Sequence, residues 1–463
     1  MNKQLVLIDG INYNLIENSN IAIVVDMPDG YSGSIEIPKK IEYNGTEYCV
    51  TSIENGAFNN CRGLTSVTIP DSVTSIGENA FNECYGLTSI TIPNSVKTIE
   101  WFAFQSCRNL SSVTISNGLV NIGDWAFAYC NALISVTISD SVKYIGCWAF
   151  YWCSSLTSIT IGNSVLSIGT RAFQSCSSLI TVSIPDSVKF IGTCAFCDCS
   201  HLIAITIGNS VTIIGKSAFL NCSSLTSAKI PDSVTTLGEY AFKGCSGLTS
   251  ITISKNLTSI GDNTFEECSG LTSVVIPDSV TSIGVSAFSG CSGLTSVTIP
   301  DSVTSIGVSA FSGCRLASIT IPDSVTNIGD HAFEKCDRLT SITIPNGVTN
   351  IIGSTFKDCS HLTSVTIGNS VTSIGKSAFR NCGALTSLTI GQSVSRIKAE
   401  SFANCKRLTD IYSLAKNVPN TNTNAFIDSG IESATLHVPA ELVDAYKAVA
   451  PWKNFKTVVA LIN

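Results

Sequence analysis

Charged residues are scarce in this chain of 463 residues: Asp, Glu, Lys and Arg together make up 13% of it, and its formal net charge is −7. Proteins that bind nucleic acid or anionic membranes through their charge carry clustered Lys and Arg, so this acidic balance argues against both partners. Histidine is rarer still, with four residues. No paired carboxylates, phosphate-binding glycine loop or nucleophile motif accompanies them, so we predict no catalytic residue, no cofactor and no enzymatic activity.

Long apolar runs are also missing. No stretch approaches the 18 apolar residues that a membrane span needs, and the run Leu5–Ile8 is too short for the core of a signal peptide. We therefore expect no membrane insertion and no signal peptide in this chain. The sequence does not determine the compartment.

What the chain has in abundance is repetition. Residues 294–314 repeat residues 271–291 with one change, Val275 for Thr298, and diluted copies cover most of the chain. Cysteine marks the period of 23 residues, at Cys61, Cys84, Cys107, Cys130, Cys153, Cys176, Cys199, Cys222, Cys245, Cys268, Cys291, Cys314, Cys336, Cys359, Cys382 and Cys405. One residue is missing after Cys314, and the register then resumes, which places the deletion in a loop. A period in this range predicts one elongated solenoid without an internal domain boundary.

Each coil follows the pattern Leu-x-x-[Ile/Val]-x-Ile-[Pro/Gly/Ser]-x-x-Val-x-x-Ile-Gly-x-x-Ala-Phe-x-x-Cys. In the first coil, the alternation over Val67–Ile69 predicts a strand with one buried face, and the proline that follows turns the chain. Val73–Gly77 predicts a second short extended edge. The three-residue spacing in Ala80–Cys84 predicts one short helical turn with Phe and Cys pointing inward.

The regular coils occupy residues 64–413, with caps at both ends. Residues 1–63 predict an N-terminal β cap with a first irregular coil, including a hairpin at Asn44-Gly45, because this dipeptide favours a tight turn. Residues 414–463 predict a degenerate coil and a helical cap over Ala440–Ala450. Leu442, Tyr446 and Val449 would share one face of that helix, which with Trp452 and Phe455 would shield the last strand.

The coil pattern resembles that of the BspA-type, or Treponema-type, leucine-rich repeat of bacterial and protist surface proteins, over nearly the whole chain. The resemblance implies an α/β leucine-rich repeat solenoid of about 16 regular 23-residue coils, strand-rich with one short helical turn per coil, plus capping segments. It also implies a cell-surface or secreted protein that attaches to host matrix proteins, surface proteins or other cells.

Twenty cysteines suggest redox or metal chemistry, yet most share the one repeat position and are expected to be buried, reduced and inert. Replacing Cys222 with serine should then bury a hydroxyl without a partner, at a cost of about 1–3 kcal/mol. Cys194-x-x-Cys197-x-Cys199-x-His201 has the spacing of a zinc site. Because Cys199 points into the core and the first two cysteines lie outside the turn, we expect no metal there.

The surface offers two candidate binding regions. Outward strand positions are rich in hydroxyls, such as Ser66 and Thr68, which is explained by β-propensity or by a hydroxyl array for a glycan or protein. Aromatic residues cluster in four successive coils and predict two stacked columns on the turn side, with Tyr144 and Tyr151 near. The candidate binding residues are Trp101, Phe102, Trp125, Tyr129, Trp148 and Trp152. Packing between turns is the competing explanation, although tryptophan and tyrosine dominate binding hot spots.

The sequence therefore predicts a monomeric, non-catalytic repeat protein that binds a protein or glycan. The alternative is a structural spacer or sensory solenoid without its own ligand.

Overall fold

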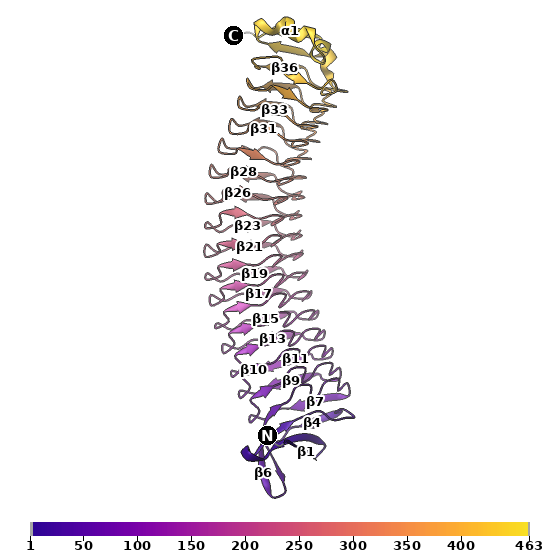
Figure 1. Cartoon of the computed structure of the whole chain (residues 1–463), viewed down its shortest axis with the longest axis vertical. Helices are drawn as coiled ribbons and strands as arrows, with labels where there is room; N and C mark the ends of the chain where they lie inside the picture. The colour runs from indigo at the N-terminus through magenta and orange to yellow at the C-terminus, as the bar shows by residue number, and fades with distance from the viewer. Residues whose placement is uncertain (1–2, 462–463) are drawn as a thin grey trace. The chain divides into compact units, whose positions relative to one another are not determined.

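The computed structural model describes residues 3–461, which fall into two compact units, bounded as Met1–Ala241 and Phe242–Asn463. Each unit is a stack of coils, and a regular coil typically contributes a longer strand, a two-residue strand and a run of turns (Figure 1). The coils are strand-rich, as the pattern predicts. The expectation of one continuous domain stays a prediction.

In the first unit the longer strands pair in parallel, with equivalent residues opposite each other, as in Val113↔Val136. Their burial alternates, so the middle side chain enters the core while its hydroxyl-bearing neighbours face outward. The longer strands are β4 (Gly33–Glu36), β7 (Leu64–Thr68), β9 (Ser89–Ile92), β11 (Ser112–Ile115), β13 (Ser135–Thr137), β15 (Ser158–Thr160), β17 (Thr181–Ser183), β19 (Ala204–Thr206) and β21 (Ser227–Lys229).

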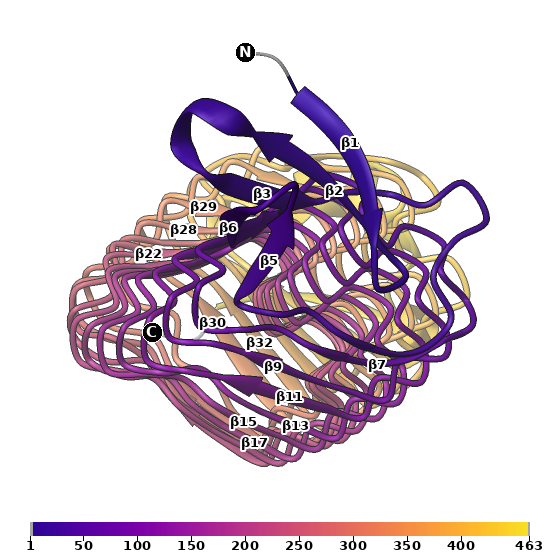
Figure 2. The same ribbon diagram turned by 90° about the horizontal axis from the view of Figure 1, so that it is seen from below.

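The two-residue strands form a second parallel sheet on another side of the coils, which is visible along the stack in Figure 2. They are β8 (Ser75–Ile76), β10 (Thr98–Ile99), β12 (Asn121–Ile122), β14 (Tyr144–Ile145), β16 (Ser167–Ile168), β18 (Phe190–Ile191), β20 (Ile213–Ile214) and β22 (Thr236–Leu237). The glycine that follows all of them except β10, where Glu100 stands, lets successive backbones approach closely. A Cβ built on Gly169, for example, would lie 2.6 Å from the Gly146 backbone.

The second unit repeats this arrangement. Its longer strands are β23 (Ser250–Thr252), β25 (Ser273–Val275), β27 (Ser296–Thr298), β30 (Ser341–Ile344), β32 (Ser364–Ile367), β34 (Ser387–Ile390), β36 (Asp410–Ser413), β38 (Thr435–Val438) and β39 (Thr457–Ala460). Its short strands are β24 (Ser259–Ile260), β26 (Ser282–Ile283), β28 (Ser305–Ile306), β29 (Asn327–Ile328), β31 (Asn350–Ile351), β33 (Ser373–Ile374), β35 (Arg396–Ile397) and β37 (Asn420–Thr421).

The residue missing after Cys314 shortens a turn, as expected, but its effect reaches the next strand. The segment Ser318–Ile321 forms no strand, so β27 and β30 belong to different sheets. The short-strand sheet continues through the same coil, because Ser305 pairs with Asn327.

In place of the predicted helical turn, each coil has a series of turns closed by hydrogen bonds between residues three positions apart. In the first regular coil, Ala80 N–H donates to the Gly77 carbonyl and Cys84 N–H to the Phe81 carbonyl. Left-handed residues precede both the alanine and the cysteine, with φ of 54° at Asn79 and 58° at Glu83. This conformation aims their N–H groups at carbonyls of the next coil, at 3.0 and 2.9 Å, so the turns are joined by hydrogen bonds as the strands are.

The core of each unit is a ladder of identical side chains. In the first unit the rings from Phe58 to Phe219 stack with centroids 4.8–5.6 Å apart. Beside them the repeat cysteines are buried and free, and from Cys84 onward thiols donate to the phenylalanine carbonyl of the preceding coil, as at Cys153 and Cys176. The expectation that a hydroxyl at Cys222 would lack a partner is therefore wrong, because its thiol lies 3.2 Å from the Phe196 carbonyl oxygen.

Five strands form the N-terminal cap together with a 3-10 turn, η1 (Glu17–Ser19): β1 (Lys3–Ile8), β2 (Ile11–Ile16), β3 (Ile21–Val24), β5 (Lys40–Tyr43) and β6 (Thr46–Ile53). The predicted hairpin joins β5 to β6, with φ of 49° at Asn44 and 73° at Gly45. β6 pairs with β3 and β8, which connects the cap to the first short strand. Tyr31 begins the phenylalanine ladder, with its ring 4.5 Å from that of Phe58.

The C-terminal cap differs from the prediction in its helix. The segment begins with the 3-10 turns η2 (Gly430–Ser433) and η3 (Ala440–Leu442), and the helix α1 covers only Val443–Ala448 before η4 (Trp452–Asn454). Val449 lies outside the helix in extended backbone and is 43% exposed, so it does not share the buried face of Tyr446. Trp452 and Phe455 instead meet the Phe426 ring edge-on at 5.5 and 5.6 Å, and β39 pairs with β38; shielding of the last strand by the two rings stays a prediction.

Candidate binding surface

An aromatic column runs across three successive coils of the first unit. Phe102, Trp125 and Trp148 occupy the repeat position before Ala-Phe, and equal positions stack. The Trp125 and Trp148 rings lie 5.0 Å apart and nearly parallel, at 7°, while Phe102 stacks on Trp125 at 6.1 Å. Arg171 extends the column, with its guanidinium carbon 5.7 Å from the Trp148 ring centroid. The predicted first column is confirmed.

The second predicted column has a different arrangement. Tyr129 does not stack on Trp152; instead Tyr151 lies between them, edge-on to Tyr129 at 5.3 Å and tilted against Trp152 at 6.5 Å. Tyr151 also meets Trp125 edge-on at 5.6 Å, so it joins the two groups into one cluster. Partial burial, followed by the adjacent Tyr151 hydroxyl, raises the pKa of Tyr129, which keeps that phenol neutral and able to donate a hydrogen bond.

The aromatic ladder, as we call this cluster, consists of Phe102, Trp125, Tyr129, Trp148, Tyr151 and Trp152. The sequence predicts Tyr151 only near the two columns and not as a member of either. It does not share a repeat position with Tyr129 or Trp152, so only the fold of the turn shows that its ring bridges them.

Two of the predicted aromatic residues lie apart from this cluster. Among the described residues, the ring of Trp101 contacts no other aromatic ring, although its indole is 56% exposed. Tyr144 is exposed on β14, where it lies in register with Phe190 and Ile213 of β18 and β20 through Ser167. The sequence holds the signal for this row in the equal repeat position of Tyr144, Phe190 and Ile213, which Ser167 interrupts.

The backbone of the ladder is unusual for such large side chains. Phe102, Trp125, Tyr129, Trp148 and Trp152 all adopt left-handed backbone, with φ between 54° and 60°. Bulky residues rarely occupy this region, and the strain is about 1–3 kcal/mol per residue. The same backbone recurs at the equivalent positions of other coils, for example at Asn79, Ser217 and Asn381, so it belongs to the repeat; stacking of an aromatic pair adds about 0.5–1.5 kcal/mol.

Other coils show what the same position usually carries. Serine stands before Ala-Phe, or before the residue pair equivalent to it, at Ser217, Ser286, Ser309, Ser354 and Ser377, with φ between 51° and 56°. The repeat therefore does not require an aromatic residue there. The ladder is a local specialisation of the turn surface.

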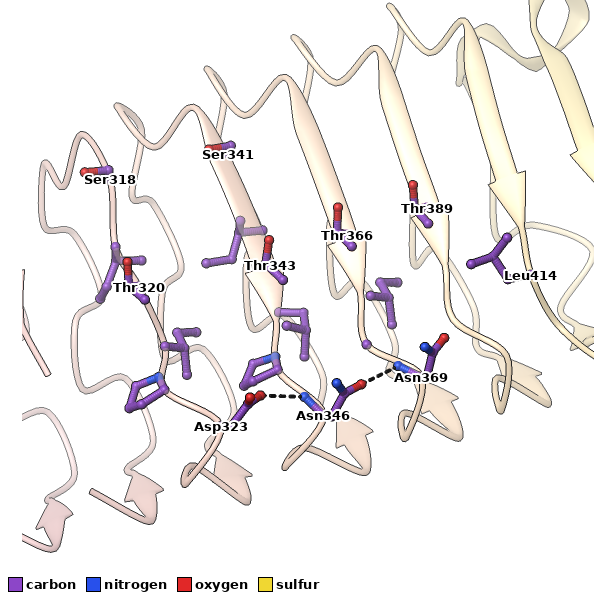
Figure 3. A pocket seen from close by; sticks show the side chains of 18 residues that line it. Ser318, Thr320, Asp323, Ser341, Thr343, Asn346, Thr366, Asn369, Thr389 and Leu414 are labelled. Atoms are coloured by element: carbon purple, nitrogen blue, oxygen red, sulfur yellow. Dashed lines mark hydrogen bonds between the residues drawn. The ribbon is translucent and has the colours of Figure 1, made fainter. Parts of the chain in front are cut away.

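Hydroxyls line the outer face of the longer strands in the second unit, next to the strandless segment (Figure 3). There a groove of about 790 Å³ is bordered by Ser318, Thr320, Thr343, Thr366 and Thr389. Below the hydroxyl row, the Asp323 carboxylate accepts the N–H of Asn346, whose amide oxygen accepts the N–H of Asn369. None of the residues that line the groove is aromatic, which makes it less suited as a binding hot spot than the aromatic ladder.

The cysteines with zinc-like spacing do not converge. Cys199 belongs to the core ladder and donates to the Phe173 carbonyl at 3.3 Å, while His201 Nδ1 lies 2.7 Å from the Ser177 carbonyl on the surface. No group of three His, Cys, Asp or Glu within residues 3–461 is arranged to hold a metal ion. In the same part of the chain, no helix has the length and apolar character needed to cross a bilayer.

The model of the BspA type leucine-rich repeat region, in six copies, matches residues 34–154, 120–243, 212–340 and 326–446. A leucine-rich repeat protein from Bacteroides ovatus is 29% identical and superposes with a TM-score of 0.64, over 90% of this chain and 99% of that one. A leucine-rich cell surface protein from Faecalibacterium prausnitzii is 31% identical over 71% of this chain and 95% of its own, with a TM-score of 0.46. A comparison with curated proteins finds no significant match.

Proposed function

Because the chain belongs to the BspA-type leucine-rich repeat family, we propose that it is a non-catalytic binding protein whose aromatic ladder contacts a protein partner. Its place at the cell surface or outside the cell is part of this proposal and rests on the family. A repeat scaffold presents similar contacts on every coil, so specific binding needs positions at which the coils differ. The ladder is the largest such departure in the first unit.

The observation that carries the proposal is the succession of large aromatic side chains at one repeat position of three successive coils. Trp125 and Trp148 hold large rings at a left-handed position that serine occupies in five other coils, so the fold does not need an aromatic residue there. Rigid aromatic rings also bury much area on binding at little entropic cost, which suits a protein interface.

The remaining candidates fit the same surface. Trp152 is 46% exposed and Trp101 is 56% exposed, so both can reach a partner that covers the turns. Arg171 adds a cation at one end of the column, and arginine is enriched at interfaces. The contact surface proposed here comprises Trp101, Phe102, Trp125, Tyr129, Trp148 and Trp152, with Tyr151 and Arg171 added.

The test compares the intact chain with the double variant Trp125→Ser and Trp148→Ser in binding to arrays of purified extracellular-matrix proteins and of glycans. Serine is compatible with the backbone at these positions, so the circular dichroism spectrum and the melting temperature should change little. We expect at least a tenfold loss of affinity for a protein ligand, since two interface tryptophans usually contribute more than about 1.4 kcal/mol together.

Tyr240→Ser is the matched control, because Tyr240 holds the same left-handed repeat position, φ 59°, outside the ladder. Its binding should equal that of the intact chain. Binding to glycans alone, sensitive to the same substitutions, would replace the protein partner with a carbohydrate. A folded chain that binds nothing on either array would instead support a structural spacer.

A further inference from the structure

Cys194 and Cys197 occupy the two ends of a single β-turn in the first unit. The Cys197 N–H donates to the Cys194 carbonyl at 3.1 Å, which closes the turn. The ends of a β-turn lie within about 7 Å between Cα atoms, and a disulfide spans about 4.4–6.8 Å. The backbone is therefore suited to a bond between these two sulfurs.

The two preceding coils carry no cysteine at these two positions. The same two positions carry Trp148 and Tyr151 in one preceding coil, and Arg171 and Gln174 in the next. Only Cys194 is partly exposed; Cys197 is buried, with 3% of its surface exposed, so the expectation that both lie outside the turn is wrong for Cys197.

Neighbouring side chains favour the thiolate form of Cys194. The pKa of its thiol is lowered to about 6, first through the neighbouring Cys197 thiol and then through the Arg171 guanidinium and the Ser217 hydroxyl. The Cys197 thiol itself donates to the Asp198 carboxylate, with 3.3 Å between sulfur and oxygen. The hydrogen bond to Cys194, together with burial, raises the pKa of Cys197. One sulfur is thus a nucleophile at neutral pH, and the other keeps its proton.

The repeat cysteines nearby favour the protonated thiol. Cys176 and Cys199 are fully buried, and burial raises the pKa of both well above its ordinary value. They are neither ionised nor accessible to a reagent in the folded chain. Reactivity in this region is therefore concentrated on the turn.

We propose that Cys194 and Cys197 form a thiol–disulfide exchange site whose substrate is a low-molecular-weight disulfide. The Cys194 thiolate attacks one sulfur of the substrate, RSSR, forms a mixed disulfide and releases RS⁻. Cys197 then loses its proton and attacks the Cys194 sulfur, which releases the second RS⁻. The two cysteines are oxidised by two electrons to one disulfide and RSSR is reduced to two RS⁻; the Cys197 proton neutralises one of these, and solvent supplies the proton for the other.

Arg171 has two contacts in this arrangement. It stabilises the thiolate on one side and lies over the Trp148 ring on the other. We assign it as a positioning residue, because it contacts the nucleophile without taking part in bond formation.

The experiment treats the intact chain with oxidised glutathione at pH 7 and maps disulfides by peptide mass spectrometry. We expect a bond between Cys194 and Cys197. The Cys197→Ser variant should stop at the mixed disulfide on Cys194, and the Cys194→Ser variant should form neither product. Absence of both products in the intact, folded chain would overturn the proposal.

A second measurement is independent of disulfide formation. The alkylation rate of Cys194 by iodoacetamide should follow a titration near pH 6 and, at pH 6.5, exceed that of the half-buried Cys147 by at least about tenfold. Arg171→Gln should move the titration upward and slow the reaction at pH 6.5, while Cys147→Ser should leave both unchanged. Equal alkylation rates for Cys194 and Cys147, in a chain whose circular dichroism shows intact coils, would also contradict the proposed exchange site.

Discussion

The Cys153 thiol donates a hydrogen bond to the backbone carbonyl of Phe127 in the preceding coil, with 3.2 Å between sulfur and oxygen. The same carbonyl oxygen accepts the N–H of Cys130, so the thiol binds to the second lone pair of that oxygen. The contact recurs along the ladder, for example from Cys84 to Phe58 and from Cys405 to Phe379. The cysteines therefore join adjacent coils through hydrogen bonds as well as through apolar packing.

Cys222→Ser should cost no more than about 1 kcal/mol of stability, because the Phe196 carbonyl can accept from a hydroxyl as it does from the thiol. The last coil already uses this chemistry, since the Ser429 hydroxyl donates to the Phe402 carbonyl. Cys222→Ala removes the donor and leaves a small cavity, so it should cost more than the serine variant. Urea unfolding followed by circular dichroism measures both. A serine variant less stable than the alanine variant would show that the hydrogen bond does not transfer.

Stability should decrease at alkaline pH. Burial raises the pKa of Cys153, Cys291 and Cys405 to about 12, whereas an unfolded cysteine titrates near 8.5. Between these values the unfolded chain releases protons that the folded chain retains, so stability is complete below pH 8.5 and is lost as pH rises towards 12. The slope reaches about 1.4 kcal/mol per pH unit for each thiol.

Urea midpoints measured from pH 7 to pH 10 test this. Cys153→Ser should give a shallower decline than the intact chain, since one titrating thiol is removed. A midpoint that does not change over this interval would mean that the ladder thiols are not the groups that titrate on unfolding.

Removal of residues 440–463 should cause aggregation while the interior coils stay folded. The deletion removes β39, which pairs with β38, and the rings of Trp452 and Phe455 that cover Phe426. It thereby exposes a sheet edge and the last ring of the phenylalanine ladder. Light scattering and circular dichroism measure the two effects. Val449→Ala, at an exposed position of the same segment, is the control and should remain monodisperse; equal behaviour of the truncated chain would refute the cap assignment.

Much of the fold was predictable because the repeat carries its own evidence. The period of the cysteines, the alternation in the longer strands and the Asn44-Gly45 hairpin all correspond to observed features, and the resemblance to the BspA-type family is confirmed by the family model. Repetition strengthens such predictions, because a weak local preference that recurs in each coil is supported by many independent positions. The C-terminal helix, which occurs once, was predicted too long and with Val449 on the wrong side.

The candidate site was predictable only in part. Stacking of Phe102, Trp125 and Trp148 follows from equal repeat positions, because coils superpose residue on residue. The bridging role of Tyr151 and the cation at Arg171 depend on how side chains at different positions lean toward each other. No spacing in the sequence encodes those directions.

The sequence by itself determined which residues enter the core and which coils carry aromatic side chains, because period and polarity are properties of the chain. The tertiary structure alone decided that residues before Ala and Cys adopt left-handed backbone, since that conformation exists to aim N–H groups at the next coil. It also decided that Cys194 has Cys197, Arg171 and Ser217 as neighbours, and its lowered thiol pKa follows from them in that order. Contacts between coils set both features, and they form only when the coils stack.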